Sequence, residues 1–323
     1  MPSQVPLDLS VIVPTYGRPE MLGRCLASLA GQCTAARYEI LVIDDGSASP
    51  TADVVNQVSR TCRAPLRFFA EAHRGPAAAR NRGIEEARGQ VLLFLGDDIL
   101  PALPSFLDEH WVSHSTRYPS QNVAVLGYTT WSPELPISQY MRWLESGGAQ
   151  FSYDKIRDGD AVDCRFFYTS NVSLKASFLG AERFDERFRH AALEDMELGY
   201  RLQQRGLKLM VNKSAAAYHH HQVTFDGYCQ RALLAGQSAA LLDTLHPHFF
   251  EHVAVPRWKR AARRLGTNAL TRGLLLGVMR LAEPSLRSLG RFFEHRHAVG
   301  WLFATLYRYY WWRGYDVEQG TMH

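Results

Sequence analysis

The amino-acid sequence predicts an α/β fold, in which a Rossmann-like, mostly parallel sheet is covered by helices and followed by a helical C-terminal extension. Two observations predict this class. Short apolar segments alternate with helical patterns over the first third of the chain, and each segment is apolar at consecutive positions rather than at every second one. Strands that are buried on both faces of a parallel sheet have such continuous apolar sequences.

The first third contains four predicted strands with helices between them. The first helix begins at Pro19, since proline suits the first turn of a helix and apolar residues then recur at i, i+3, i+4 and i+7. Gly75-Pro76 starts another helix. The predicted strands are residues 9–13, 38–43, 66–69 and 91–95, and the predicted helices begin near residues 19, 52 and 76.

The rest of the chain has a less regular pattern. Residues 129–163 contain several prolines and glycines, which predict a long loop with one short helix near residues 139–144. A loop of that length in a compact domain usually has a function. After about Phe225 the chain is predicted to be helical, with a boundary near residues 245–256. The other predicted elements are strands at residues 123–128, 166–174, 207–211 and 215–218 and a helix at residues 194–205.

The composition is that of a folded protein with a large core. The chain has 323 residues, of which 46% are hydrophobic, and a net charge of +4, which excludes intrinsic disorder. Five scattered cysteines without a C-x-x-C pair argue against disulfide or zinc-ribbon frameworks and fit a reducing compartment. No segment has the ~18 consecutive apolar residues of a spanning helix, and no secretory signal is visible. We therefore expect a cytoplasmic protein.

The positive charge is concentrated near the C-terminus. Residues 256–300 have a net charge of +8, so the remainder sums to −4, and residues 301–315 are rich in Trp and Tyr. Basic, aromatic-rich helices suit the surface of an anionic membrane. The alternative is that these helices pack on the rest of the protein with solvated arginines. No nucleic-acid-binding motif accompanies the charge, so nucleic acid is not an expected partner.

Polar residues follow three predicted strands, at the positions where parallel sheets bind ligands. Pro14-Thr15-Tyr16 follows the first strand, Asp44-Asp45 the second and Gly96-Asp97-Asp98 the fourth. Turn chemistry explains one such cluster, but three at one edge of a sheet favour a site. Clustered carboxylates need a positive partner, which a divalent cation with a phosphate-containing ligand provides. The absence of G-x-G-x-x-G and G-x-x-x-x-G-K-[ST] disfavours dinucleotide and P-loop sites.

Two predicted helices carry charged residues that could belong to the same site. Arg80 lies on a core-facing stripe, so it needs the strand-end aspartates or a bound phosphate as its partner, unless it is a surface arginine. Asp195 extends the apolar stripe of its helix toward the protein body, where it is a candidate general base. Glu194 lies on the other face, which is expected to be solvated and to carry a Glu197–Arg201 pair.

Histidines form two groups in the sequence. Alternation after a strand places His219 and His221 on one side and His220 on the other. Neutral imidazole is a good metal ligand, although adjacent histidines are often surface residues. His110 and His114 are one helical turn apart but have no third ligand, so we expect them to be structural.

Five segments together resemble the family 2 glycosyltransferases with a GT-A fold. They keep their order and spacing over residues 9–240. The resemblance implies a GT-A domain at residues 1–245, with a nucleotide-sugar half at about 1–128 and an acceptor half at about 129–245, before a basic, aromatic-rich helical extension at 246–323. The segments are LSVIVPTY (9–16), LVIDDGS (41–47), ARNRG (79–83), FLGDD (94–98) and EDMELGYRL (194–202).

The resemblance implies an inverting, metal-dependent hexosyltransferase that moves a sugar from a nucleoside-diphosphate sugar to an acceptor hydroxyl. The expected cofactor is Mg²⁺ or Mn²⁺, the acceptor a glycan or lipid-linked glycan, and the pathway cell-surface polysaccharide or glycolipid synthesis. Asp195 would be the base, ionised at pH 7 with an ordinary aspartate pKa. Asp98 and His219, or His221 instead, would hold the metal. The residues expected to bind the nucleotide sugar are Pro14, Thr15, Tyr16, Asp45, Arg80 and Asp97. Asn171 and Glu194 are expected to shape the acceptor side of the site.

One position departs from the family pattern. Gly96 replaces the first aspartate of the D-x-D motif, and Asp97 is the residue that could substitute for it. The departure leaves a second hypothesis, a non-catalytic nucleotide-sugar-binding or scaffold protein. A nucleotidyltransferase is a third hypothesis, but it would need a glycine-rich loop with a basic residue after the first strand.

Overall fold

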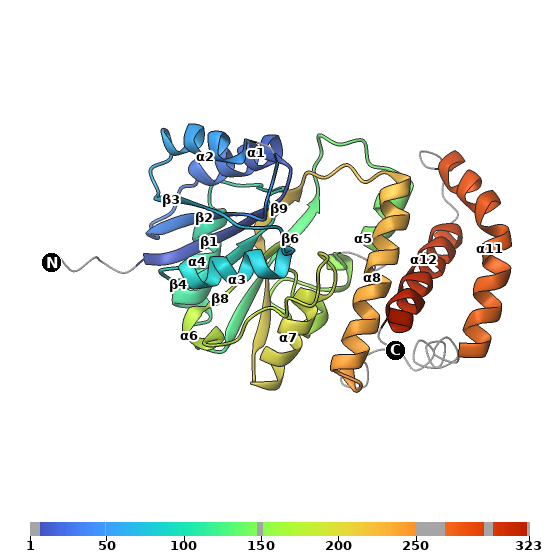
Figure 1. Cartoon of the computed structure of the whole chain (residues 1–323). Coiled ribbons are helices and arrows are strands. Elements are labelled where there is room, and N and C mark those ends of the chain that lie inside the picture. Colours follow the sequence, from blue (N-terminus) through green and yellow to red (C-terminus); the bar gives the residue numbers. More distant parts are fainter. Residues whose placement is uncertain (1–6, 49, 147–150, 250–268, 294–299, 322–323) are drawn as a thin grey trace. The chain divides into compact units, whose positions relative to one another are not determined.

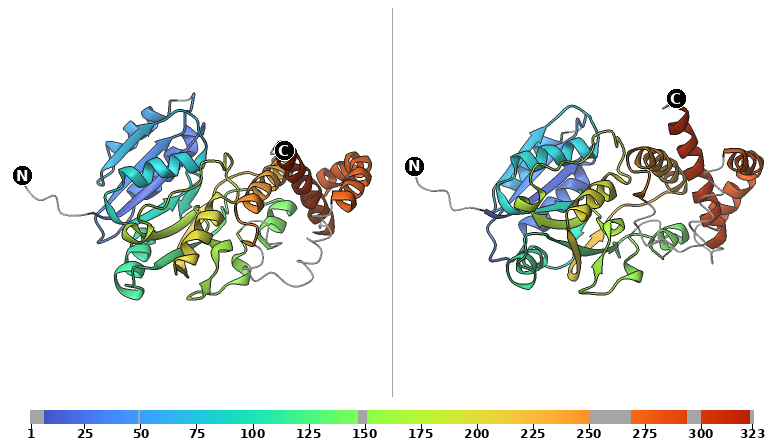
Figure 2. Two further views of the ribbon diagram at one scale, coloured as in Figure 1. Left: turned by 60° about the horizontal axis from the view of Figure 1, so that its bottom comes forward. Right: turned by 90° about the horizontal axis from the view of Figure 1, so that it is seen from below.

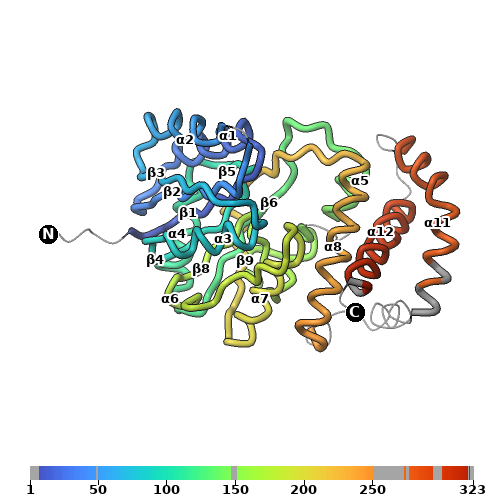
Figure 3. Tube along the Cα trace, viewed as in Figure 1, coloured from blue at the N-terminus to red at the C-terminus, as the bar shows by residue number. Residues whose placement is uncertain are grey.

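A computed structural model describes residues 7–48, 50–146, 151–249, 269–293 and 300–321. The chain divides into two compact units (Figure 1). The first comprises Met1–Leu135 and Tyr153–His221, and the second comprises Pro136–Ser152 and Gln222–His323. The tube in Figure 3 traces the chain through its elements in order. Each unit has its own packing and is described by itself.

The first unit is built on one sheet. Its strands are β1 (Leu7–Thr15), β2 (Tyr38–Asp44), β3 (Leu66–Ala70), β4 (Gly89–Leu95), β5 (Ile99–Pro101), β6 (Val123–Trp131), β7 (Ala161–Val162), β8 (Asn171–Lys175) and β9 (Lys208–His219). Among the described residues their order is β3-β2-β1-β4-β8-β6-β9-β5, with β7 paired to β9. β1 to β4 run parallel, whereas β8 is antiparallel to both neighbours. The predicted α/β class is confirmed.

Helices cover both faces of the sheet's parallel part. Side chains of α1, α2 and α4 share one apolar core with alternate residues of β1, β2 and β4. α3 packs on the other face, where Gly83 lies against Ile12 so closely that an added Cβ would overlap its methyl group. The helices of this unit are α1 (Pro19–Ala30), α2 (Thr51–Ser59), α3 (Pro76–Glu86), α4 (Phe106–Val112), α6 (Ala176–Leu179) and α7 (Glu194–Gln204).

Three predicted strands differ from the observed ones. The strand predicted at residues 166–174 begins only at Asn171, because Cys164–Phe166 forms a 3-10 turn that Asp163 caps. The strands predicted at residues 207–211 and 215–218 are one strand, β9, whose pairing with β6 shifts register at Gly127/Tyr128. β5 was not predicted, since three residues are too few to show a pattern.

The regular elements in the described part of the second unit are all helices. Its helices are α5 (Gln139–Ser146), α8 (Phe225–Leu245), α11 (Ala269–Phe292) and α12 (Gly300–Thr321). α8 and α12 run side by side (Figure 2), and the Tyr228 hydroxyl on α8 donates a 2.5 Å hydrogen bond to the Phe303 carbonyl on α12. The prediction of helix after Phe225 is confirmed for these residues.

The basic segment at residues 256–300 is described only in part. Residues 256–268 and 294–299, which carry much of its charge, lie outside the described residues. Within the described ones, none of the helices combines the length and apolar character needed to cross a membrane. By its packing, α8 belongs with the C-terminal helices, whereas the predicted domain boundary at residue 245 assigns it to the preceding domain. That boundary between functional domains stays a prediction.

Candidate active site at the carboxyl edge of the sheet

Thr15 connects the ends of three parallel strands. It is the last residue of β1, and its carbonyl oxygen accepts a 2.9 Å hydrogen bond from the backbone N–H of Asp45, just after β2. Its hydroxyl donates a 2.7 Å hydrogen bond to Oδ2 of Asp97, just after β4. The clusters that follow β2 and β4 are therefore both hydrogen-bonded to the cluster at the end of β1, so the three predicted clusters lie together.

Asp45 holds the loop that leads into α3. Its carboxylate accepts hydrogen bonds from the backbone N–H groups of Arg74 at 2.8 Å and Gly75 at 2.9 Å, and lies 2.9 Å from Nδ1 of His73. The His73 ring stacks on the ring of Tyr16, with centroids 4.3 Å apart. Tyr16 is half exposed, so this pair offers a flat aromatic surface beside a buried carboxylate.

Asp97 and Asp98 share one guanidinium group. Arg18, in the turn between β1 and α1, forms an ion pair with Oδ1 of Asp97 through one nitrogen and with Oδ2 of Asp98 at 2.6 Å through another. Burial, followed by the charge of Asp98, raises the pKa of Asp97 to about 7. Burial would also raise the pKa of Asp98, but the neighbouring His219 and Arg18 outweigh it and hold that pKa well below its usual range.

Two histidines face Asp98 from the end of β9. His219 Nε2 lies 3.4 Å and His221 Nδ1 3.8 Å from Oδ2 of Asp98, and their rings stack on each other. His220 faces the other way, with Nδ1 3.0 Å from the Ser132 hydroxyl. This is the alternation that the sequence predicted.

The donor set around Asp98 fits part of a divalent metal site. Carboxylate oxygen and imidazole nitrogen both suit Mn²⁺, and carboxylate suits Mg²⁺. No group of three such side chains in the described parts of the chain is arranged to hold an ion by itself. Mg²⁺ in phosphate-handling enzymes is commonly bound by one or two carboxylates together with substrate phosphates and water, and Asp98 fits that mode.

Arg80 is buried, as predicted, but its partner is Glu194. Nη1 of Arg80 lies 2.7 Å from Oε1 of Glu194, and both side chains are at least 90% buried. The carboxylate that Arg80 contacts is therefore on α7 and does not come from a strand-end aspartate. The expected solvation of the Glu194 face is wrong for the same reason: Glu194 is neutralised by Arg80, and buried Glu197 by Arg201.

Asp195 lies next to this pair at the start of α7. Its carboxylate accepts hydrogen bonds from the backbone N–H of Met196 at 2.8 Å and of Thr169 at 3.3 Å. The carbonyl oxygen of Ser170, which follows Thr169, accepts a hydrogen bond from the backbone N–H of Gly96. Asp195 is thereby linked through Thr169 and Ser170 to the Gly96-Asp97-Asp98 segment. Burial, and then the charge of Glu194, raise the pKa of Asp195 to about 7. The expectation of an ordinary aspartate pKa is wrong.

Asn171 lies inside the protein rather than on an acceptor surface. It is fully buried, its amide nitrogen donates to the carbonyl oxygen of Ala215 at 2.9 Å, and its Oδ1 lies 2.9 Å from Nε2 of His110. His110 and His114 both contact the Ser173 hydroxyl, and burial lowers their pKa values to about 4 and about 3. The two histidines are structural, as predicted, and Asn171 belongs to their network.

Arg18 and His73 are the site residues that sequence reasoning missed. Both follow strands of the parallel sheet, since Arg18 comes just after β1 and His73 just after β3. The strand-end rule that selected Asp45 and Asp98 could have selected them too, but only acidic and hydroxyl residues were considered there.

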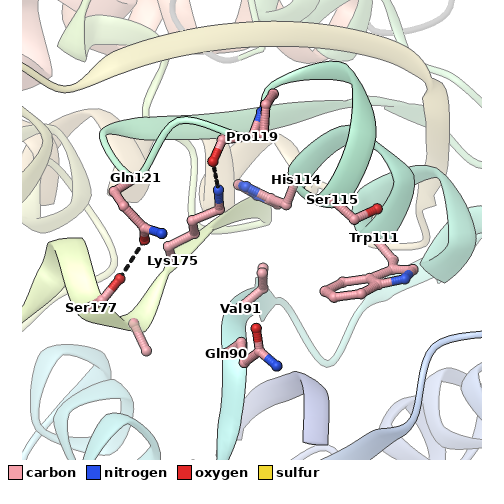
Figure 4. A pocket seen from close by; sticks show the side chains of 10 residues that line it. Gln90, Val91, Trp111, His114, Ser115, Pro119, Gln121, Lys175 and Ser177 are labelled. Carbon is pink, nitrogen blue, oxygen red and sulfur yellow. Dashed lines mark hydrogen bonds between the residues drawn. The ribbon is translucent and has the colours of Figure 1, made fainter.

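A separate cavity of about 380 Å³ lies at the opposite edge of the sheet (Figure 4). It is lined by Gln90 and Val91 at the start of β4 and by Lys175 at the end of β8, which pair in antiparallel register. Nζ of Lys175 donates to backbone carbonyls of Pro119 and Ser120. The aspartates follow the other end of β4, so this cavity is not part of the candidate active site.

Comparison with known sequences gives one family. Residues 10–108 match the sequence model described as Glycosyl transferase family 2. Validoxylamine A glucosyltransferase of Streptomyces hygroscopicus subsp. jinggangensis is 34% identical over 236 residues, which cover 66% of this chain and 55% of the relative. Chondroitin synthase of Escherichia coli is 26% identical over 274 residues, covering 75% and 39%. The chain thus spans about half or less of the length of these curated relatives.

Comparison with solved structures gives the fold. The mannosyltransferase PcManGT from Pyrobaculum calidifontis, in complex with GDP-Man and Mn²⁺, has a TM-score of 0.61 at 18% identity, covering 99% of this chain and 89% of that one. TarS 1-349 of S. aureus, in complex with UDP-GlcNAc, has a TM-score of 0.55 at 18% identity, covering 97% and 92%. The arrangement of strands and helices is that of the GT-A glycosyltransferases, as predicted.

Proposed function

This chain belongs to glycosyltransferase family 2, and from that premise we propose that it is an inverting enzyme that transfers a hexosyl group from a nucleoside-diphosphate sugar to an acceptor hydroxyl. The observation that carries the proposal is the linkage of Asp45, Asp97 and Asp195 at one sheet edge through Thr15 and the Thr169-Ser170 backbone. Solved neighbours in complex with GDP-Man and UDP-GlcNAc support a nucleotide-sugar donor.

The donor would lie along the ends of β1, β2 and β4. The exposed Tyr16 ring, backed by His73, suits the flat face of a nucleobase, and buried Asp45 fixes the loop beside it. Asp98 and His219 would hold Mg²⁺ or Mn²⁺, which supplies positive charge to a departing diphosphate. A solved neighbour with Mn²⁺ supports this assignment.

The acceptor would be activated by Asp195. Backbone N–H groups of Met196 and Thr169 orient its carboxylate, and the Arg80–Glu194 pair lies beside it. A general base works best when its pKa is close to the working pH, because it is then both ionised and basic enough to take a proton. The raised pKa of Asp195 suits removal of the acceptor's hydroxyl proton while the oxygen attacks the anomeric carbon.

The acceptor and location are further parts of the proposal. A relative named chondroitin synthase supports polysaccharide or glycolipid synthesis, with a glycan or lipid-linked acceptor. Exposed apolar side chains on the C-terminal helices, such as Leu281 at 86% and Trp301 at 60% exposure, would suit peripheral contact with a membrane surface. All five cysteines are free thiols, which fits a cytoplasmic location.

Replacing Asp195 tests the proposal. Asp195→Asn keeps the size of the side chain and one of its two accepted hydrogen bonds but removes the base, so we expect transfer to fall by about 10²- to 10⁴-fold with donor binding unchanged. The measurement is release of nucleoside diphosphate over a panel of nucleotide sugars with Mn²⁺ and glycan acceptors. Asp53→Asn, an exposed carboxylate on α2, is the matched control and should keep full activity. A wild-type protein that binds a donor but never turns it over with any metal would instead be a nucleotide-sugar-binding scaffold.

A further inference from the structure

The guanidinium group of Arg18 lies where a bound cation would balance Asp97 and Asp98. We propose that Arg18 is an internal counter-cation, which closes this aspartate pair in the absence of donor and must be displaced before a divalent metal binds Asp98. The inference rests on the proposed function in one respect, the assignment of Asp98 as a metal-binding residue.

The contacts of Arg18 form a bridge between the two carboxylates. One guanidinium nitrogen contacts Oδ1 of Asp97 and the other lies 2.6 Å from Oδ2 of Asp98. The second oxygen of Asp97 accepts the Thr15 hydroxyl, so Asp97 has both oxygens engaged and is only 1% exposed. If Arg18 leaves, Asp97 keeps its Thr15 hydrogen bond in the interior, whereas Asp98, with 13% side-chain exposure, is the carboxylate that can exchange its partner.

A metal ion and Arg18 would compete for the same atom. Oδ2 of Asp98, which Arg18 contacts, is also the oxygen nearest to His219 Nε2 and His221 Nδ1. A divalent ion held between this oxygen and an imidazole would lie within a few ångströms of the guanidinium, and two cations at that distance repel each other strongly. The two states therefore exclude each other.

Gly96 leaves room for the Asp98 carboxylate in this position. A Cβ at position 96 would lie 2.9 Å from Oδ1 of Asp98, so the carboxylate rests against the space that a side chain would fill. In the family pattern an aspartate stands here, and its absence removes one negative charge from the pair's surroundings. Arg18 then neutralises the two carboxylates that remain.

Arg18 can leave the pair without disturbing the core. Its side chain is 42% exposed, and it precedes Pro19 at the first turn of α1. The turn is fixed by other groups: Gly17 has a φ of 67° and donates its N–H to the Ser47 hydroxyl at 2.7 Å. Rotation of the Arg18 side chain into solvent breaks only its two ion pairs.

Metal titration without donor tests this inference. The variants are Arg18→Gln, which removes the charge, and Arg18→Lys, which keeps it but loses the fork that spans two carboxylates. Arg24→Gln is the matched control, because Arg24 is 39% exposed and ion-paired with Glu134 but contacts neither aspartate. Mn²⁺ affinity is measured from the free-ion electron paramagnetic resonance signal at low salt.

We expect Arg18→Gln to bind Mn²⁺ at least about tenfold more tightly than the wild type, with Arg18→Lys between them and Arg24→Gln unchanged. Without metal, Arg18→Gln should melt at a lower temperature than the wild type, and Mn²⁺ should raise its melting temperature more. Equal or weaker Mn²⁺ binding by both Arg18 variants would overturn the inference. No sugar donor enters this titration, so its outcome is independent of whether the protein transfers a sugar.

Discussion

Asp195 is surrounded by charges of both signs, and these charges decide when it can accept a proton. Its carboxylate lies beside buried Glu194, whose negative charge raises the pKa, and near Arg80, whose positive charge lowers it. Loss of solvation is the largest influence and also raises the pKa, so that it reaches about 7. Asp195 is consequently protonated below neutral pH and becomes a base above it.

The pH dependence of the reaction follows from this titration. Below pH 7 the fraction of ionised Asp195 falls tenfold per pH unit, so kcat/KM should rise with pH on the acid side and level off above about pH 7. Glu194→Gln removes the charge that raises the pKa and leaves Arg80 unopposed, so it should shift the acid limb to lower pH. The check is kcat/KM between pH 5 and 9 for both proteins. An identical limb in Glu194→Gln would contradict the assignment of Asp195 as the base.

For single residues, the sequence was a better guide to their positions than to their ion-pair partners. The apolar stripe of α3 left an interior and a surface position open for Arg80, and the structure shows the interior one. Its partner Glu194 is 114 positions away, and a helical wheel assigned that residue to solvent. Only the tertiary structure shows that the two charges meet.

Among the elements, α8 and α12 come into close backbone contact within the described part of the second unit. A Cβ added at Gly236 on α8 would overlap the carbonyl oxygen of Trp311, and one added at Gly314 on α12 would overlap that of Leu233. Two backbones come into contact at these positions because neither residue has a side chain. The packing of this pair thus depends on two glycines.

Substitution of these glycines tests the packing of the helix pair. Gly236→Ala should destabilise the protein by about 1–3 kcal/mol, because the helices must move apart to accept a methyl group. Gly277→Ala on α11 is the control: it is exposed, nothing lies near its added Cβ, and alanine should stabilise the helix by about 0.5–1 kcal/mol. Urea unfolding measures both variants. A Gly236→Ala protein as stable as the wild type would contradict the observed contact.

Elements with strong local patterns were predicted, and elements set by tertiary contacts were not. The continuous apolar runs of β1, β2 and β4 and the stripe of α1 reflect burial along the whole element. The start of β8 depends instead on a 3-10 turn capped by Asp163, and the continuity of β9 depends on a register shift against β6. Such features need a partner strand or cap that a single sequence does not identify.

Over the whole molecule, the site's place in the fold was predictable because parallel strands end at the same edge. Thr15, Asp45 and Asp97 meet there as the strand order requires. Their bonding was not predictable: two of the carboxylates are used by the protein itself, Asp45 to hold a loop and Asp97 to bind Thr15 and Arg18. Asp98 is bound by Arg18 as well, and in the proposed account it becomes open to ligands when Arg18 releases it.

The measurement that tests the central claim most directly is thermal unfolding with a panel of nucleoside-diphosphate sugars, each with and without Mn²⁺. A ligand that binds only the folded state raises the melting temperature. We expect at least one donor to stabilise the wild type and Asp195→Asn in the presence of Mn²⁺, and this gain to be lost in Asp98→Asn. If no donor raised the melting temperature of the wild type, or Asp98→Asn gained as much, the sheet edge would not be a nucleotide-sugar site.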